Sequence, residues 1–192
     1  MISIEDAYKY LKENLNENRY MHTLGVVSVA RKLAEINGVS EEKAEIAALS
    51  HDIAKNIKVK EIKKILKENN VILTEYENKT PALWHSIVGP TVAKEVFKIE
   101  DEDILSAIRW HSTGRENMSK LDKIIYIADM IEPSRRFEGL DDIRKETIQK
   151  LDRGVLKGLT HSIEYLLSKG QLIDINTINA RNYLLIHSKE ED

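Results

Sequence analysis

Apolar residues in this chain recur three and four positions apart over most of its length, and this spacing constrains the fold more than any other feature. The spacing matches the α-helix, which has about 3.6 residues per turn, whereas a half-buried β-strand requires strict alternation of apolar and polar residues. No alternating segment of useful length occurs, and only 8 glycines and 3 prolines interrupt the 192 residues. The sequence therefore predicts an all-α fold.

Local start and stop signals divide this pattern into roughly nine or ten helices. Ser3, Ser40 and Ser119 have the short hydroxyl side chain preferred at helix N-caps, and Gly38 is a stop signal. Pro90 stands inside a helical pattern and is expected to kink or break it, because proline lacks the backbone donor. The predicted helices are a short one after Ser3, then 18–37, one after Ser40 that carries His51 and Asp52, 58–70, one from Pro81 that includes His85, 101–111, 119–131, 141–168 and 176–188.

The length and composition of the chain favour one domain over residues 1–192 and exclude several classes of protein. A net charge of −3 argues against a nucleic-acid backbone or an anionic membrane as partner. Because the chain lacks cysteine, any metal must be bound by His, Asp, Glu or water. No signal peptide is recognisable, and no apolar run approaches the roughly 20 residues of a membrane span. We expect a cytoplasmic protein.

Four of the six histidines extend an apolar stripe of their own predicted helix, so they are expected to face inward. Asp52 follows one of them directly, and Asp129 lies in a strongly apolar run, where an unpaired carboxylate would be costly. Taken singly, each histidine is better explained as a core residue with a local hydrogen-bond partner. Taken together, the set indicates a metal site, whose candidate ligands are His22, His51, Asp52, His85, His111 and Asp129.

The remaining two histidines are predicted to lie outside this site. His161 shares its helix face with Lys157, Gly158 and Glu164, which is typical of a surface position. His187 lies near the end of the chain, where the polar residues 188–192 are expected to fray. We assign neither histidine to the metal site.

Four histidines and two aspartates suit a pair of metal ions better than a single tetrahedral zinc, since one bridging carboxylate leaves positions for water. Two metals about 3.5–4 Å apart would suit phosphoester hydrolysis. Phosphate oxygens would need basic residues and free backbone N–H groups around the metals. The candidates, for each of which a plain surface or turn position is the alternative, are Lys55, the turn Thr113-Gly114, Arg115, Arg135 and Arg136.

The candidate ligands resemble the metal-binding pattern of the HD-domain phosphohydrolases in their dinuclear form. Within that family, longer stretches look like the YqeK group, the bacterial symmetrical diadenosine tetraphosphatases. These stretches are 82–86, 107–115, 118–133 and the pair Arg135-Arg136. The resemblance covers about residues 18–150, to which the C-terminal helices at about 141–188 are added. Two positions depart from the pattern, namely Pro90 after Gly89 and Ser50 before His51.

The resemblance implies a helical bundle with specific roles for these residues. His22, His51, Asp52 and Asp129 would hold one iron-like ion and His85 and His111 the second, with Asp52 bridging. A metal-bound hydroxide would attack diadenosine tetraphosphate and release two ADP, with catalytic roles for Asp52 and Lys55. Phosphate oxygens would be held by Lys55, Thr113, Arg115 and Arg135, and Gly114 would belong to the same turn. The nucleoside pocket would be lined by 129–132, including Ile131 and Glu132, and by Arg136.

Several alternatives remain open from the sequence. The chain is compatible with an HD phosphohydrolase that acts on another nucleotide, or with a nucleotide-binding regulator that does not hydrolyse. The ligand set also accepts manganese, zinc, nickel or cobalt in place of iron. The apolar stripe on 141–168 either packs internally or forms the face of a homodimer.

Overall fold

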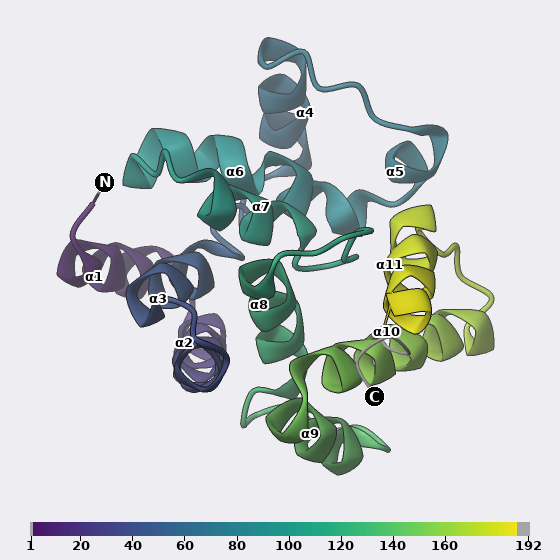
Figure 1. Cartoon of the computed structure of the whole chain (residues 1–192). Coiled ribbons are helices and arrows are strands. Elements are labelled where there is room, and N and C mark those ends of the chain that lie inside the picture. Colours follow the sequence, from purple (N-terminus) through teal and green to yellow (C-terminus); the bar gives the residue numbers. More distant parts are fainter. Residues whose placement is uncertain (1, 188–192) are drawn as a thin grey trace.

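The computed structural model describes residues 2–187, and within that range it contains eleven α-helices, one 3₁₀ helix and no strand (Figure 1). The predicted all-α class is confirmed, and the number of helices slightly exceeds the predicted nine or ten. The elements are α1 (Ile4–Asn14), α2 (Glu17–Asn37), α3 (Glu41–Ser50), α4 (Val59–Glu68), α5 (Glu75–Lys79), η1 (Pro81–Leu83), α6 (Trp84–Phe97), α7 (Glu102–Trp110), α8 (Lys120–Ile131), α9 (Leu140–Gln149), α10 (Leu151–Ser168) and α11 (Ile175–His187).

The helix starts follow from short polar side chains that satisfy free backbone N–H groups. The hydroxyls of Ser3, Ser40 and Ser119 accept hydrogen bonds from the first turns of α1, α3 and α8, as the sequence predicts. Gly38 ends α2 in the left-handed conformation, with φ +66°, which glycine adopts without steric cost. The predicted last helix is α11, and the polar residues 188–192 lie outside the described residues.

The predicted helix 141–168 is wrong in one respect, because the structure divides it into α9 and α10. The chain turns at Lys150, which has extended φ and ψ angles of −152° and 117°. Gly154 lies inside α10 and lets the two helices cross closely. A Cβ atom at Gly154 would lie 2.1 Å from Oγ1 of Thr147. The apolar period continues through the break because both helices pack on the same core.

The sequence predicts that Pro90 kinks or breaks its helix. The helix is not broken, because α6 continues through Pro90 from Trp84 to Phe97. The proline gives up one backbone hydrogen bond, which the surrounding packing tolerates. The neighbouring Gly89 lets α6 approach α7 closely, since a Cβ atom there would lie 2.8 Å from Cγ2 of Ile108. Ser50, the other departure, is buried and donates its hydroxyl to the carbonyl of Ile46 at 2.7 Å.

Helix α8 occupies the centre of the molecule (Figure 1) and packs against α2, α3, α7, α9 and α10. Ile124, Ile125 and Ile127 on this helix are fully buried. The buried apolar side chains form one cluster that extends from Ala7 in α1 to Leu184 in α11. None of the helices between residues 2 and 187 combines the length and apolar character needed to cross a membrane. The central position of α8 brings its last turn, with Asp129, next to α2 and α3.

Candidate metal centre

The six predicted ligands lie on or directly beside five helices. His22 is in α2, His85 in the first turn of α6 and Asp129 in the last turn of α8. His51 and Asp52 were predicted inside a helix, but α3 ends at Ser50 and both residues follow it in a turn. His111 likewise follows the end of α7. Three of these histidines therefore lie at helix ends, where chain direction changes and side chains from different helices converge.

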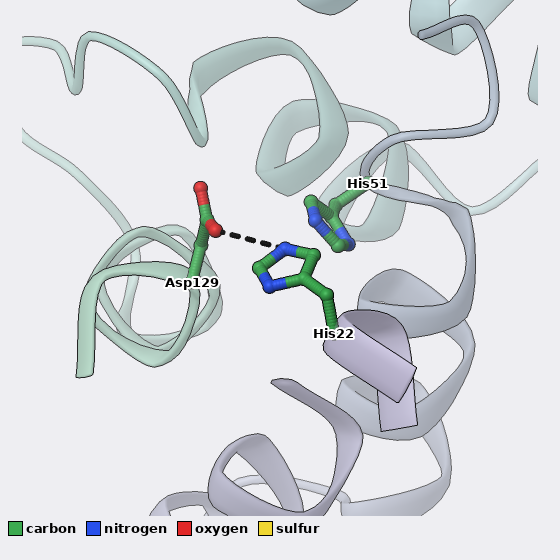
Figure 2. A group of neighbouring side chains, drawn as sticks. All are labelled: His22, His51 and Asp129. Atoms are coloured by element: carbon green, nitrogen blue, oxygen red, sulfur yellow. Dashed lines mark ion pairs between the residues drawn. The ribbon is translucent and has the colours of Figure 1, made fainter. Parts of the chain in front are cut away.

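The structure brings all six residues together in two adjoining groups. The first triad is His22, His51 and Asp129 (Figure 2), and the second triad is Asp52, His85 and His111. Within each triad, the candidate ligand atoms lie within 4.8 Å of one another. The four imidazole rings form a continuous row in which neighbouring centroids are 5.6, 5.1 and 5.1 Å apart, in the order His22, His51, His111 and His85.

Asp52 lies between the two triads. One oxygen, Oδ1, is 3.2 Å from Nε2 of His85 and 3.5 Å from Nε2 of His111. The other oxygen, Oδ2, is 3.8 Å from Nε2 of His51 in the first triad. The carboxylate therefore presents one oxygen to each side, which is the arrangement that a bridging ligand requires.

Each histidine directs Nδ1 away from the centre and Nε2 toward it. In three of them, Nδ1 donates to the backbone carbonyl three residues earlier, at 2.7 Å from His51 to Ala48, 2.7 Å from His85 to Ala82 and 2.8 Å from His111 to Ile108. These bonds fix the tautomer that carries its proton on Nδ1 and leave a lone pair on Nε2. The helix ends thus orient these three imidazoles so that their Nε2 lone pairs are available to a metal ion.

Several polar atoms in this centre need a cation or a proton. Nε2 of His51 and Oδ1 of Asp52 are buried and have no hydrogen-bond partner among residues 2–187. Nε2 of His85 and Nε2 of His111 face each other at 3.1 Å although both carry lone pairs when Nδ1 is the donor. Burying such atoms unpaired is costly. The nitrogen and oxygen donors therefore fit a dinuclear centre of borderline metal ions.

The protonation states support the same conclusion. Burial lowers the pKa of His51 and of His85, so both imidazoles are neutral lone-pair donors near pH 7. Burial by itself would raise the pKa of Asp52 and Asp129, but the neighbouring histidines outweigh it and the pKa of each carboxyl lies below its ordinary value. For His22, burial lowers the pKa, but the hydrogen bond with Asp129 outweighs it and the pKa is raised.

Glu132 was predicted to line the nucleoside pocket, but it lies behind His22. Glu132 is 1% exposed, and its Oε1 accepts a hydrogen bond from Nδ1 of His22 at 3.0 Å. The backbone N–H of Ser134 donates to Oε2 at 2.6 Å, and Arg144 donates to the Glu132 carbonyl at 2.9 Å. A carboxylate held in this way orients the imidazole and strengthens it as a ligand. Sequence analysis missed this role because the contact joins residues 110 positions apart.

The four candidate phosphate-binding cations lie in different surroundings. Lys55 is at the second triad, with Nζ 3.0 Å from Nε2 of His85, and Arg135 donates to the carboxylate of Asp129 in the first triad. Arg115 instead donates a hydrogen bond at 3.0 Å to Asp122, and Asp122 belongs to the capping box at the start of α8. Arg136 donates to the carbonyls of Pro133 and Arg135. Only Lys55 and Arg135 therefore contact the candidate ligands among these four.

A cavity of about 870 Å³ adjoins the metal centre. Its lining includes the predicted residues Thr113 and Arg135, together with Ser112, Phe137 and His161, which the sequence analysis did not assign. A second cavity of about 900 Å³ is lined by Ile131 and Arg136, on the other side of the segment after α8. Gly114 lies outside both linings, in the left-handed conformation with φ +66°. Ser112, Phe137 and His161 are polar or aromatic residues at partly buried positions, and this combination is the signal that could have marked them as lining a cavity.

Comparisons with known proteins agree with this geometry. The model of the HD domain family matches residues 19–134. The symmetrical bis(5'-nucleosyl)-tetraphosphatase of Bacillus subtilis is 38% identical over 181 residues, covering 94% of this chain and 97% of that protein. The enzyme of the same name from Halalkalibacterium halodurans is 39% identical over 185 residues, covering 95% and 97%.

A solved structure gives the same result for the fold. The crystal structure of an HD superfamily hydrolase, described as involved in NAD metabolism, from Clostridium acetobutylicum superposes with a TM-score of 0.92. Its sequence is 43% identical, and the match covers 97% of this chain and 98% of that chain. All six candidate ligands fall inside the matched range 19–134. The chain belongs to the HD domain family of metal-dependent hydrolases.

Proposed function

We propose that this chain is a symmetrical dinucleoside tetraphosphatase, which cleaves diadenosine tetraphosphate to two ADP. The observation that carries the proposal is the pair of adjoining triads with Asp52 between them. Three relatives that match this chain over nearly their full length bear the name symmetrical bis(5'-nucleosyl)-tetraphosphatase. Water attacks one of the two inner phosphorus atoms, and the bond from that atom to the central bridging oxygen breaks. One ADP keeps the oxygen of the water, the other keeps the bridging oxygen, and the protons of the water pass to these oxygens or to solvent.

The proposed ligand set assigns one ion to each side of Asp52. His22, His51 and Asp129 would hold the first ion, and His85 and His111 would hold the second, with Asp52 between the two groups. The distances from the two oxygens of Asp52 to His51 and to His85 support this division. Iron is the metal that we propose, with manganese, zinc, nickel and cobalt as alternatives, since all accept nitrogen and oxygen donors.

The chain's own residues position the substrate. When bound, two such ions polarise phosphoryl oxygens and lower the pKa of coordinated water. Lys55 lies 3.4 Å from Oδ1 of Asp52 and half-exposed at the centre, so its ammonium group can bind an oxygen of the phosphate under attack. Arg135 and Thr113 line the adjoining cavity and are proposed to hold further phosphate oxygens. Asp52 keeps its charge because its lowered pKa prevents protonation near neutral pH.

We further propose that the whole chain acts as one domain on a free nucleotide. The buried apolar cluster that extends from Ala7 to Leu184 supports this, as does the cavity whose lining comes from both parts of the chain. The net charge of −3 gives no general attraction for a nucleic acid.

The product pattern tests the proposal. Metal-loaded protein is incubated with diadenosine tetraphosphate, and the nucleotides are separated by anion-exchange chromatography. ADP as the only product is the expected result. ATP together with AMP would show asymmetrical cleavage and contradict the proposal. Turnover of mononucleotides alone would favour an HD phosphohydrolase with another substrate, and binding without turnover would favour a regulator.

A further inference from the structure

We propose that Phe137 and His161 form a stacking site for a base of the nucleotide. This inference rests on the proposed function and names the part of the site that recognises the nucleoside. Both residues line the cavity of about 870 Å³ beside the metal centre. Both also lie outside residues 19–134, the range that matches the HD domain. The C-terminal part of the chain would therefore select a nucleotide over a bare polyphosphate.

The cavity reaches the metal centre at Ser112. The hydroxyl oxygen of Ser112 lies 3.1 Å from Nε2 of His111 and 3.3 Å from Nε2 of His85. Arg135 lines the same cavity and donates to the carboxylate of Asp129. The cavity thus borders residues of both triads. The cavity therefore lies next to the position that a phosphate bound at the metal centre would occupy.

Part of the cavity wall is aromatic. The rings of Phe137 and His161 stack with centroids 4.4 Å apart and an interplanar angle of 26°. Both side chains are only partly buried, so the pair keeps surface facing the cavity. Tyr165, one turn further along α10, lines the same wall and is 53% exposed. Flat π-faces at the margin of a cavity are the surfaces on which nucleic-acid bases stack.

The polarity of the cavity matches the groups in a nucleotide. Ser112, Thr113 and Arg135 supply hydroxyl and guanidinium groups near the metals, where phosphate would lie. Phe137 and His161 supply the aromatic wall, where a base would lie. The volume of about 870 Å³ is within the usual range of ligand pockets, about 300–1,000 Å³. The lining thus offers both groups that bind phosphate and rings that bind a base.

Binding measurements with two probes separate base recognition from phosphate recognition. The metal-loaded full chain is titrated calorimetrically with ADP and with inorganic pyrophosphate, which lacks a nucleoside. His161→Ala should weaken ADP binding about tenfold, a typical loss for one base–aromatic contact, and leave pyrophosphate binding unchanged. His161→Phe keeps an aromatic face and should restore ADP affinity. Phe137→Leu, which keeps the apolar volume, should weaken ADP binding in the same selective way.

A matched control comes from another ring pair in which a histidine contacts a different aromatic residue. His187 contacts the ring of Tyr183 with centroids 4.2 Å apart, and neither residue lines the cavity. His187→Ala should leave the affinity for both probes unchanged. Circular dichroism and thermal unfolding of every variant show whether the fold is retained.

Two results would overturn the stacking site. One is unchanged ADP affinity in folded His161→Ala and Phe137→Leu variants. The other is an equal loss for ADP and pyrophosphate, which would indicate that the pair only supports the cavity wall. The product assay with the parent chain tests the proposed function separately, because a chain that binds ADP selectively but does not cleave diadenosine tetraphosphate retains the base site and loses the activity.

Discussion

The two triads of the candidate metal centre have similar ligands but different support. In the first triad, His22 is held by the carboxylate of Glu132, and Asp129 is paired with Arg135. In the second triad, both imidazoles are held by uncharged backbone carbonyls, those of Ala82 and Ile108. Lys55 is the charged side chain beside the second triad. It is exposed and contacts Nε2 of His85, so it does not orient the ring through Nδ1.

This difference separates two ways of building a metal ligand. A backbone carbonyl at a helix end orients an imidazole through geometry that side-chain substitution leaves intact. A carboxylate adds negative charge, makes the imidazole a stronger donor and is removable by a single substitution. We therefore expect the first triad to bind its ion more tightly and to depend more on neighbouring side chains. Asp52 couples the triads, since each of its oxygens faces one of them.

Removing the shared carboxylate should have the largest effect, because it breaks both triads at once. In Asp52→Ala, we expect loss of metal from both sites and turnover at background level, measured by elemental analysis and the ADP product assay. Asp141→Ala is a suitable control, since Asp141 is an aspartate whose side chain is 98% exposed. Full metal content or retained turnover in Asp52→Ala would exclude the bridging role.

Lys55 tests the substrate side of the second triad. Its Nζ lies 3.0 Å from Nε2 of His85 and 3.4 Å from Oδ1 of Asp52, beside the proposed phosphate position. Lys55→Met removes one charged donor and should lower kcat by about 100- to 1,000-fold, the usual cost of losing a transition-state donor.

Metal content should be retained in Lys55→Met, because the ligands are intact. Lys60→Met, at an exposed lysine of α4, should behave like the parent chain. A kcat within twofold of the parent's, or loss of metal, would show that Lys55 is a plain surface residue or a structural one.

Glu132 tests the charged support of the first triad. Glu132→Gln keeps the size of the side chain and removes the negative charge that accepts the bond from His22. We expect the affinity of one of the two metal sites to fall about 10- to 100-fold, the usual cost of losing an orienting partner. The second site should be unaffected, since its imidazoles donate to Ala82 and Ile108. Stepwise metal titration with a chromophoric chelator resolves the two sites, and equal weakening of both would contradict the assigned difference.

The sequence predicts the metal centre better than its surroundings, for a physical reason. Histidines on apolar helix faces are visible in the period of a single helix, so local spacing is enough to mark His51 and His111 as candidate ligands. Glu132 contacts His22 across 110 positions, and no local pattern reports such a contact. His161 shares its face with Lys157 and was predicted to lie at a surface position, but it is partly buried and lines the cavity.

The fold shows the same contrast between local and distant information. Helix starts at Ser3 and Ser119 depend on neighbouring residues and are predicted correctly. The break at Lys150 is not predicted, because the apolar residues of α9 and α10 keep one period while both helices face the same core. The short helix α5 is also missed, although its capping box from Thr74 to Glu77 is a local signal. Its five residues are too few to produce a periodic pattern.

Two close-packed glycines give the smallest and most selective test of the difference between the triads. A Cβ atom at Gly25 would lie 2.7 Å from Oε2 of Glu132, whereas one at Gly89 would lie 2.8 Å from Cγ2 of Ile108. Alanine gains about 1 kcal/mol of helix propensity over glycine, and overpacking costs about 1–3 kcal/mol.

The glycine substitutions should therefore have different outcomes for metal binding. Ile108 is fully buried and branched at Cβ, so Gly89→Ala should lose about 1–2 kcal/mol of unfolding free energy in urea, but it should leave the affinity of the first metal site unchanged. Glu132 is pinned by His22 and Ser134, so Gly25→Ala should lose about 1–2 kcal/mol of unfolding free energy and weaken only the first metal site. Equal effects of the two substitutions on metal affinity would mean that the first triad does not depend on the position of Glu132. A loss of metal affinity confined to Gly25→Ala would show that the first triad depends on the position of Glu132 as well as on its charge.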